Sequence, residues 1–200
     1  MDHSLATVCR RSGLENDAPF NKHMMESVHW HDNQDCTCVM MMFIVVGLLE
    51  WWAGRNVWSH ADHQCVLDMD TSSRPNSQYA FDPWLPGHVN HGVFFVAVLL
   101  WLFPRFQKRL VIALALGMEA CWEIVENQDC IVKRFRMRGY IGDSVVNSFV
   151  DILACWMGAQ LAWCLGVRRS IYFVVVVEIV SFWLWNDNVL RNISRLCFPD

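Results

Sequence analysis

The chain has 200 residues with a formal net charge of −4, and 54% of its residues are hydrophobic, including 11 Trp and 12 Phe. This length suits a single domain, and the small acidic charge, without a long basic run, excludes a typical nucleic-acid-binding protein. The apolar and aromatic content exceeds that of an ordinary soluble domain and indicates contact with lipid.

The N-terminal segment, residues 1–37, is polar and lacks the apolar core of a signal peptide. We interpret it as a flexible tail and residues 38–200 as a transmembrane helical domain. Within this domain, five apolar segments approach the length of a membrane span: residues 38–54, 87–104, 110–126, 143–166 and 171–190. Polar loops, among them residues 127–142, join the segments, and a polar tail follows residue 190.

Each apolar segment is expected to be a helix, because a lipid-exposed backbone must satisfy its own hydrogen bonds. Five segments of this length are too few and too long for a membrane barrel. A soluble bundle is disfavoured, since several of the segments have no polar face to present to water. The sequence therefore predicts an all-α fold, a polytopic membrane bundle of about five transmembrane helices.

Polar side chains interrupt these segments at helical spacing. Residues three or four apart lie on one face of a helix, and the sets are, in chain order, His88 and His91; Glu119, Glu123 and Glu126; and Asp143, Asn147 and Asp151. Ionisable residues inside a span are costly and usually face the bundle interior or a wet cavity. We therefore expect all three sets to face other helices.

The connectivity should bring these sets together. Helices that cross in alternation place the ends of the first, third and fifth on the side where the second and fourth begin. Glu50 and Asp187 lie near such ends, so they join the three sets on that side. A single polar pocket near one membrane face explains this segregation. Glu178 lies mid-span and is expected to have only an interhelical partner.

The fourth segment is expected to have two different faces. Ala154 and Gly158 continue the stripe of Asp143, and small residues suit close helix packing. The opposite face is expected to contact lipid, and it carries Val145, Ile152, Trp156 and Trp163.

The chain contains, in this order, NSQYAFDPW, HVNHG, EACWEIVEN, YIGDSVVNSFVDI and NDNVLRN. Together these pieces resemble an uncharacterised family of bacterial multi-pass inner-membrane proteins, mostly alphaproteobacterial, which forms a domain of unknown function. The resemblance runs from about residue 54 to 199 and implies a location in the bacterial inner membrane and no agreed activity. The N-terminal segment lies outside the pattern, and Asn186 stands where the family favours Arg. The matching polar residues are Asn76, Ser77, Asp82, His88, His91, Glu119, Glu123, Glu126, Asn127, Arg134, Arg136, Asp143, Ser144, Asn147, Asp151, Asp187 and Asn188.

The first functional hypothesis is a metal-dependent enzyme that acts on a lipid-linked substrate. Imidazole and carboxylate ligands suit zinc, manganese or iron, and the candidate metal ligands are His88, His91, Glu123 and Asp143. The candidate catalytic carboxylates are Glu119, Glu123, Asp143 and Asp151. Candidate binding residues are Arg134 and Arg136, for an anionic head group, and Asn76, Asn127, Asn147, Asp187 and Asn188. No strict metal motif such as HExxH supports this hypothesis.

Two alternatives remain open. A non-catalytic membrane scaffold or lipid-binding protein would use the same polar residues to fix helix packing. A transporter is less favoured, because the acids stay near one membrane face and leave no polar path across. The expected partner is membrane lipid, with a homo-oligomer as a further option.

Overall fold

The computed structural model describes residues 32–58, 66–70, 77–135 and 141–198. Contacts divide the chain after Thr37, and everything below concerns the unit Cys38–Asp200, apart from the first residues of one helix that crosses this boundary. The helices are α3 (Asp32–Trp52), α4 (Leu85–Leu102), α5 (Lys108–Glu126), α6 (Asp129–Phe135), α7 (Val145–Trp185) and α8 (Val189–Cys197). The described residues form no strand beyond one isolated bridge, which confirms the all-α prediction.

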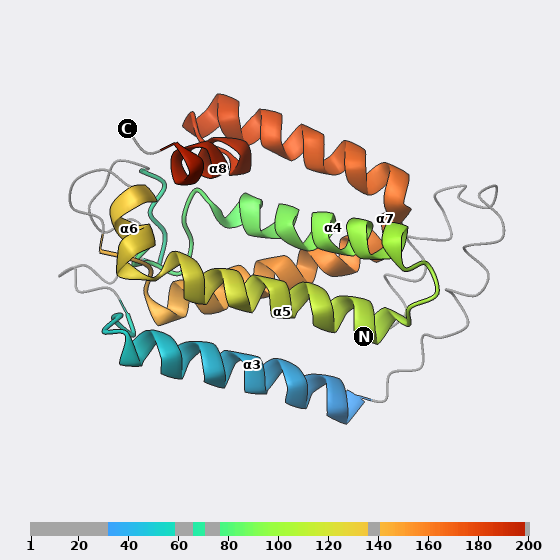
Figure 1. The fold of residues 1–200 in the computed structure, drawn as a ribbon, viewed down its shortest axis with the longest axis horizontal. Helices are drawn as coiled ribbons and strands as arrows, with labels where there is room; N and C mark the ends of the chain where they lie inside the picture. Colours follow the sequence, from blue (N-terminus) through green and yellow to red (C-terminus); the bar gives the residue numbers. More distant parts are fainter. Residues whose placement is uncertain (1–31, 59–65, 71–76, 136–140, 199–200) are drawn as a thin grey trace. The chain divides into compact units, whose positions relative to one another are not determined.

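Helix α7 contains a sharp reversal at Gly166. Its φ of 71° and ψ of 169° are not helical, and glycine tolerates such a positive φ because it lacks a Cβ atom. In Figure 1 the ribbon doubles back here, so residues 145–165 and 167–185 form separate rods. These rods correspond to the fourth and fifth predicted segments. The connection that the sequence places between them is reduced to one residue.

Two short helices were not predicted. Helix α6 lies within the loop expected at residues 127–142, and α8 replaces the expected C-terminal tail. The fifth predicted helix ends early, because Asn186 adopts a left-handed conformation with φ 52°, which is a common way to end a helix. Asn188 then caps α8 by accepting a hydrogen bond from the Arg191 backbone N–H at 2.9 Å.

The helices of the described unit expose apolar side chains and bury several charged ones beside an apolar core. Large apolar side chains are exposed on every long rod, for example Met40, Ile44, Leu48, Phe94, Leu114, Leu153, Met157, Val176 and Ile179. Buried charged side chains include Glu50, Glu119, Glu123 and Asp151. Among the described helices, Leu85–Leu102 alone has the length and apolarity that a bilayer crossing requires, and Val39–Trp52 is a shorter apolar helix. One such helix gives weak support for a membrane location.

Residues 145–165 of α7 form the central rod of the bundle. Helix α3 packs against it through Phe43 and Phe149, whose ring centroids are 5.0 Å apart, and α5 packs against it where Leu116 meets Ile152 in the apolar core. The expected lipid-facing side of this rod is therefore mostly wrong, because Val145, Ile152 and Trp163 are buried and only Trp156 is exposed. Other helices cover most of this rod, and its exposed large apolar side chains are Leu153, Trp156 and Met157.

On its remaining side, the central rod packs so closely against α4 that the backbones of the two helices are in contact. A Cβ atom added at Gly92 would lie 1.9 Å from the Cys155 carbonyl oxygen, and one at Gly158 would lie 2.0 Å from the Val89 carbonyl oxygen. Only glycine fits at both positions. The small-residue stripe through Gly158 that the sequence indicated is confirmed as a close helix contact.

We expect Gly92→Ala and Gly158→Ala each to destabilise the protein by about 3 kcal/mol, since either methyl group would push two backbones apart. Thermal unfolding of the purified protein, followed by circular dichroism, measures this. Gly117→Ala is the matched control, because a Cβ atom there meets nothing within 4 Å and alanine favours a helix. If the melting temperatures of Gly92→Ala and Gly117→Ala are equal, the close contact is wrong.

Candidate functional site

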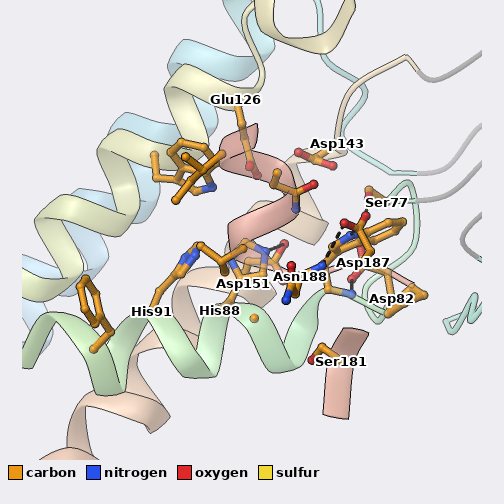
Figure 2. Close-up of a pocket in the computed structure, with 18 of the residues that line it drawn as sticks. Ser77, Asp82, His88, His91, Glu126, Asp143, Asp151, Ser181, Asp187 and Asn188 are labelled. Atoms are coloured by element: carbon orange, nitrogen blue, oxygen red, sulfur yellow. Dashed lines mark hydrogen bonds and ion pairs between the residues drawn. The ribbon is translucent and has the colours of Figure 1, made fainter. Parts of the chain in front are cut away.

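A cavity of about 480 Å³ opens among α4, α5, both rods of α7, α8 and the segments that precede α4 and α7. Figure 2 shows polar side chains from these parts of the chain around it. The polar part of the wall consists of Ser77, Asp82, His88, His91, Glu126, Asp143, Asn147, Asp151, Glu178, Ser181, Asp187, Asn188 and Asn192. The apolar part includes Phe94, Phe95, Met118, Trp122, Val125, Trp185, Val189 and Ile193. The cavity therefore suits an amphiphilic molecule.

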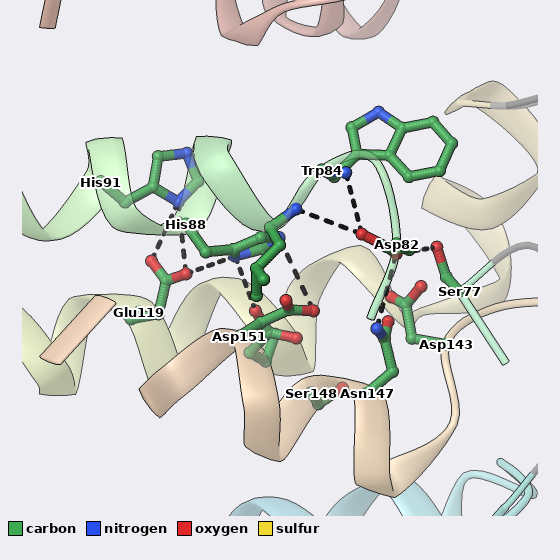
Figure 3. A network of polar contacts seen from close by, with 12 residues as sticks. Ser77, Asp82, Trp84, His88, His91, Glu119, Asp143, Asn147, Ser148 and Asp151 are labelled. Atoms are coloured by element: carbon green, nitrogen blue, oxygen red, sulfur yellow. Dashed lines mark hydrogen bonds and ion pairs between the residues drawn. The ribbon is translucent and has the colours of Figure 1, made fainter. Parts of the chain in front are cut away.

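Asp82 fixes the start of α4 and so the position of its histidines. Its Oδ1 accepts hydrogen bonds from the backbone N–H groups of Trp84 at 2.8 Å and Leu85 at 3.2 Å. Its Oδ2 accepts from the Ser77 hydroxyl at 2.8 Å and the Asn147 amide at 3.4 Å. Asp82 thereby ties the loop before α4 to the first turn of α7 (Figure 3).

Glu119 holds both histidines of α4. Its carboxylate lies 2.6 Å from His88 Nδ1 and 3.0 Å from His91 Nδ1, as Figure 3 shows. A histidine that donates its Nδ1–H to a carboxylate presents the lone pair of Nε2 on its other side, which is the usual arrangement behind a metal-binding imidazole. The Nε2 atom of His88 faces Asp151, with 3.7 Å to Oδ2.

Glu123 and Asp151 lack the hydrogen bonds that buried carboxylates normally have. Glu123 is fully buried, and neither of its oxygens has a hydrogen-bond partner. Its Oε1 is 3.4 Å from His88 Nδ1, and Oδ1 of Asp151 is also unpartnered. His88, Glu123 and Asp151 can each offer a ligand atom, and these atoms lie within 4.8 Å of one another. Three buried candidate ligands from three helices therefore lie close together.

A second group of ligand atoms adjoins the first. Glu123, Glu126 and Asp143 also offer atoms within 4.8 Å of one another. Asp143 stands just before α7, where its backbone N–H donates to Asn127 Oδ1 at 2.8 Å. Gly142 precedes it with φ 93°, and a Cβ atom there would lie 2.6 Å from the Arg55 guanidinium. The approach of Asp143 to the cavity therefore depends on glycine at 142.

The predicted metal ligands do not form one set. One group contains His88 and Glu123, and a second contains Glu123 and Asp143. His91 belongs to a third group, with His88 and Glu119. In that third group the Glu119 oxygens are already bonded to imidazoles. The four predicted ligands therefore divide among neighbouring groups that share His88 or Glu123.

The predicted binding residues have different surroundings. Asn147 and Asn188 line the cavity, and so does Asp187, which Arg195 Nη1 contacts at 3.0 Å. Asn127 lies away from the cavity and donates to Glu50 Oε1 and Ser148 Oγ, at 3.4 Å each. The Arg134 side chain, Asn76 and Arg136 lie outside the described residues.

Sequence reasoning missed three groups that bond to residues of the cavity wall. Asn90 donates to Glu178 Oε1 at 2.9 Å, which is the interhelical partner that the sequence left unnamed. Trp84 Nε1 donates to Asp187 at 3.3 Å, and Arg195 approaches Asp187 from α8. Asn90 does not share the helix face of His88 and His91, because it is two residues from one and one residue from the other. The contacts of Trp84 and Arg195 depend on the tertiary structure and leave no periodic signal in the sequence.

Comparisons with known proteins agree with the resemblance. A family model described as "Protein of unknown function (DUF2585)" matches residues 31–200. A "UPF0314 protein" of Paracoccus denitrificans is 35% identical over 163 residues, which cover 80% of this chain and 84% of that protein. UPF0314 proteins of Brucella anthropi (32% identical, 62% of this chain and 65% of that protein) and Rhizobium johnstonii (27%, 82% and 85%) also match. No solved structure matches the chain.

We expect Glu119→Ala to destabilise the protein by about 3 kcal/mol, because it removes the shared carboxylate partner of two largely buried imidazoles. Chemical or thermal unfolding of the purified variant measures this. Asp129→Ala serves as the control. Asp129 forms an ion pair with Arg55 but is itself exposed, so the pair should contribute less than about 1 kcal/mol to stability. Equal losses in both variants would contradict the anchoring role of Glu119.

Proposed function

Because the chain belongs to the DUF2585 family, whose function is unknown, we propose a function from its own geometry. The protein is a multi-pass protein of the bacterial inner membrane, in which His88, Glu123 and Asp151 bind a divalent metal. The metal centre acts on an amphiphilic, lipid-linked substrate bound in the adjoining cavity. The observation that carries the proposal is the pair of buried carboxylates, Glu123 and Asp151, with three oxygens that lack a hydrogen-bond partner, beside the imidazole of His88, which contacts Glu119.

The outer surface supports insertion of the five rods in a membrane. An apolar surface of this extent would be costly in water and is suited to acyl chains. Exposed tryptophans occur near both ends of the rods, as in the aromatic belts of membrane proteins. Trp52 and Trp183 are 84% and 81% exposed near the helix ends on the cavity side, and Trp101 is 71% exposed at the other end.

The ligand set supports a metal rather than a purely structural polar cluster. An unpaired buried carboxylate costs several kcal/mol, and a divalent cation removes this cost by direct coordination. The Nε2 atom of His88 and Oδ2 of Asp151 are 3.7 Å apart, which is compatible with two ligands at roughly 2.0–2.2 Å from one ion. Imidazole with carboxylates suits zinc, manganese or iron.

The cavity wall supports an amphiphilic substrate with an ester or phosphoester group. Its polar side chains would face the head group, and its aromatic and aliphatic side chains would face the chain. A metal held by His88, Glu123 and Asp151 would supply Lewis-acid chemistry toward a carbonyl or phosphoryl oxygen and a means to activate water. Asp143 also lines the cavity. Arg134 and Arg136 are proposed, from the sequence alone, to hold an anionic head group.

A membrane scaffold is the second candidate, and a specific observation favours it. Several polar contacts join different helices without involving the metal ligands, such as Asn90 with Glu178 and Asn127 with Glu50 and Ser148. Contacts of this kind fix helix packing in lipid. In that case Glu123 and Asp151 would share protons and bind no metal.

We expect the purified protein, loaded with Zn²⁺ or Mn²⁺ and then gel-filtered, to retain metal measured by inductively coupled plasma mass spectrometry. His88→Ala and Asp151→Asn should weaken Zn²⁺ binding by about 100-fold or more, since each removes a ligand. Glu178→Gln is the matched control, because Glu178 lines the same cavity but belongs to none of the ligand groups. A wild-type protein that binds no metal, or variants that bind as the wild type does, would favour the scaffold.

We expect the expressed protein to stay in the membrane pellet after an alkaline carbonate wash, because its apolar surface requires lipid. The metal-loaded protein should also hydrolyse a short-chain phosphatidic acid or phosphatidylcholine, with release of phosphate or fatty acid that Asp151→Asn abolishes. Extraction into the carbonate supernatant would contradict the membrane proposal. Hydrolysis that is unchanged in Asp151→Asn would contradict the metal mechanism.

A further inference from the structure

We propose that the site holds two divalent cations bridged by Glu123. The first is the ion assigned above to His88, Glu123 and Asp151, so this inference rests on the proposed function. The second is bound by Glu123, Glu126 and Asp143. The two ligand groups each have their atoms within 4.8 Å of one another, and Glu123 belongs to both.

The state of Glu123 points to a bridging ligand. Both of its oxygens are buried without a hydrogen bond, so each has a lone pair for a metal ion. A carboxylate that coordinates one ion through each oxygen holds the pair at the separation of roughly 3.5–4 Å found in two-metal sites. Glu119, by contrast, has its oxygens engaged by His88 and His91, so the group that contains it serves to orient the imidazoles.

The backbone arrangement brings the ligands together as two parallel rows. Glu123 and Glu126 are one turn apart near the end of α5, and Asp151 and Asp143 lie along the start of α7. Helix α5 ends where α7 begins, so the two rows run side by side in opposite chain directions. Asp151 therefore lies toward His88, and Asp143 lies toward Glu126 (Figure 2).

The charges of the ligands match two ions. Glu123, Glu126, Asp143 and Asp151 carry four negative charges when ionised, and two dications supply four positive charges. Two of these carboxylates, Glu123 and Asp151, are buried with oxygens that have no hydrogen-bond partner, where uncompensated charge is strongly disfavoured.

Both ions would border the cavity. His88 and Asp151 of the first group and Glu126 and Asp143 of the second group line it, whereas the bridging Glu123 does not. A substrate oxygen that enters the cavity could therefore bridge the two ions. A phosphate or an ester carbonyl bound in this way would be polarised by both ions.

The stoichiometry of bound metal tests the inference. We expect native mass spectrometry of the full-length protein in detergent, loaded with Mn²⁺ or Zn²⁺, to show two ions per chain. Glu126→Gln and Asp143→Asn should retain one ion, and Glu123→Gln should lose both. Electron paramagnetic resonance of the Mn²⁺-loaded wild type should show a magnetically coupled pair, which Glu126→Gln converts to an isolated ion. Glu178→Gln should keep two ions.

The outcomes separate this inference from the proposed function. One ion in the wild type, unchanged in Glu126→Gln and Asp143→Asn, overturns the second ion and leaves the first in place. No bound ion in the wild type overturns both. Glu126 is only partly buried and its replacement is nearly isosteric, so this variant should keep its fold, which circular dichroism and gel filtration check. Two ions in both the wild type and Glu126→Gln would also contradict the assigned ligands.

Discussion

The backbone contact between α4 and the central rod of α7 determines the geometry of the site. At Gly92 and Gly158 the two helices approach so closely that a single methyl group would overlap a carbonyl oxygen. His88 lies one turn before Gly92 and Asp151 lies two turns before Gly158, so this contact sets the separation of the imidazole from the carboxylate. A side chain between the rods would widen that separation, and the ligand atoms of the two helices would no longer reach one point. Packing and chemistry therefore depend on the same two residues.

The buried polar residues separate into those that the protein satisfies and those that it does not. Asp82 accepts hydrogen bonds from the loop before α4 and from α7, and Glu119 is bonded to two histidines. These residues hold the site in position. Glu123 and Asp151 lie among them with unpaired oxygens. A bound cation would give these oxygens a partner, and this contrast between neighbouring carboxylates supports the metal proposal more strongly than the number of acids does.

The sequence predicted the five rods and the polar stripes because both have regular physical causes: a span needs sustained apolarity, and a costly charge must face inward. It could not predict which rod is central. Val145 and Ile152 look like lipid-facing residues, because apolar side chains suit lipid and a protein core equally well. Helix α8 was not predicted, because it is short and amphipathic and its average composition is that of a polar C-terminal tail. His91 does not belong to either ligand group that contains Glu123. This depends on side-chain positions, which the spacing of residues along a helix does not determine.

The reversal at Gly166 has a consequence for how this architecture can diversify. Residues 103–107 and the glycine itself are the only connections at the end of the bundle away from the cavity, within the part of the chain that the structure describes. The long connections, residues 53–84 and 127–144, both join helices at the cavity end. Changes in chain length are therefore accommodated most easily in these connections, where they leave the register of the rods unchanged.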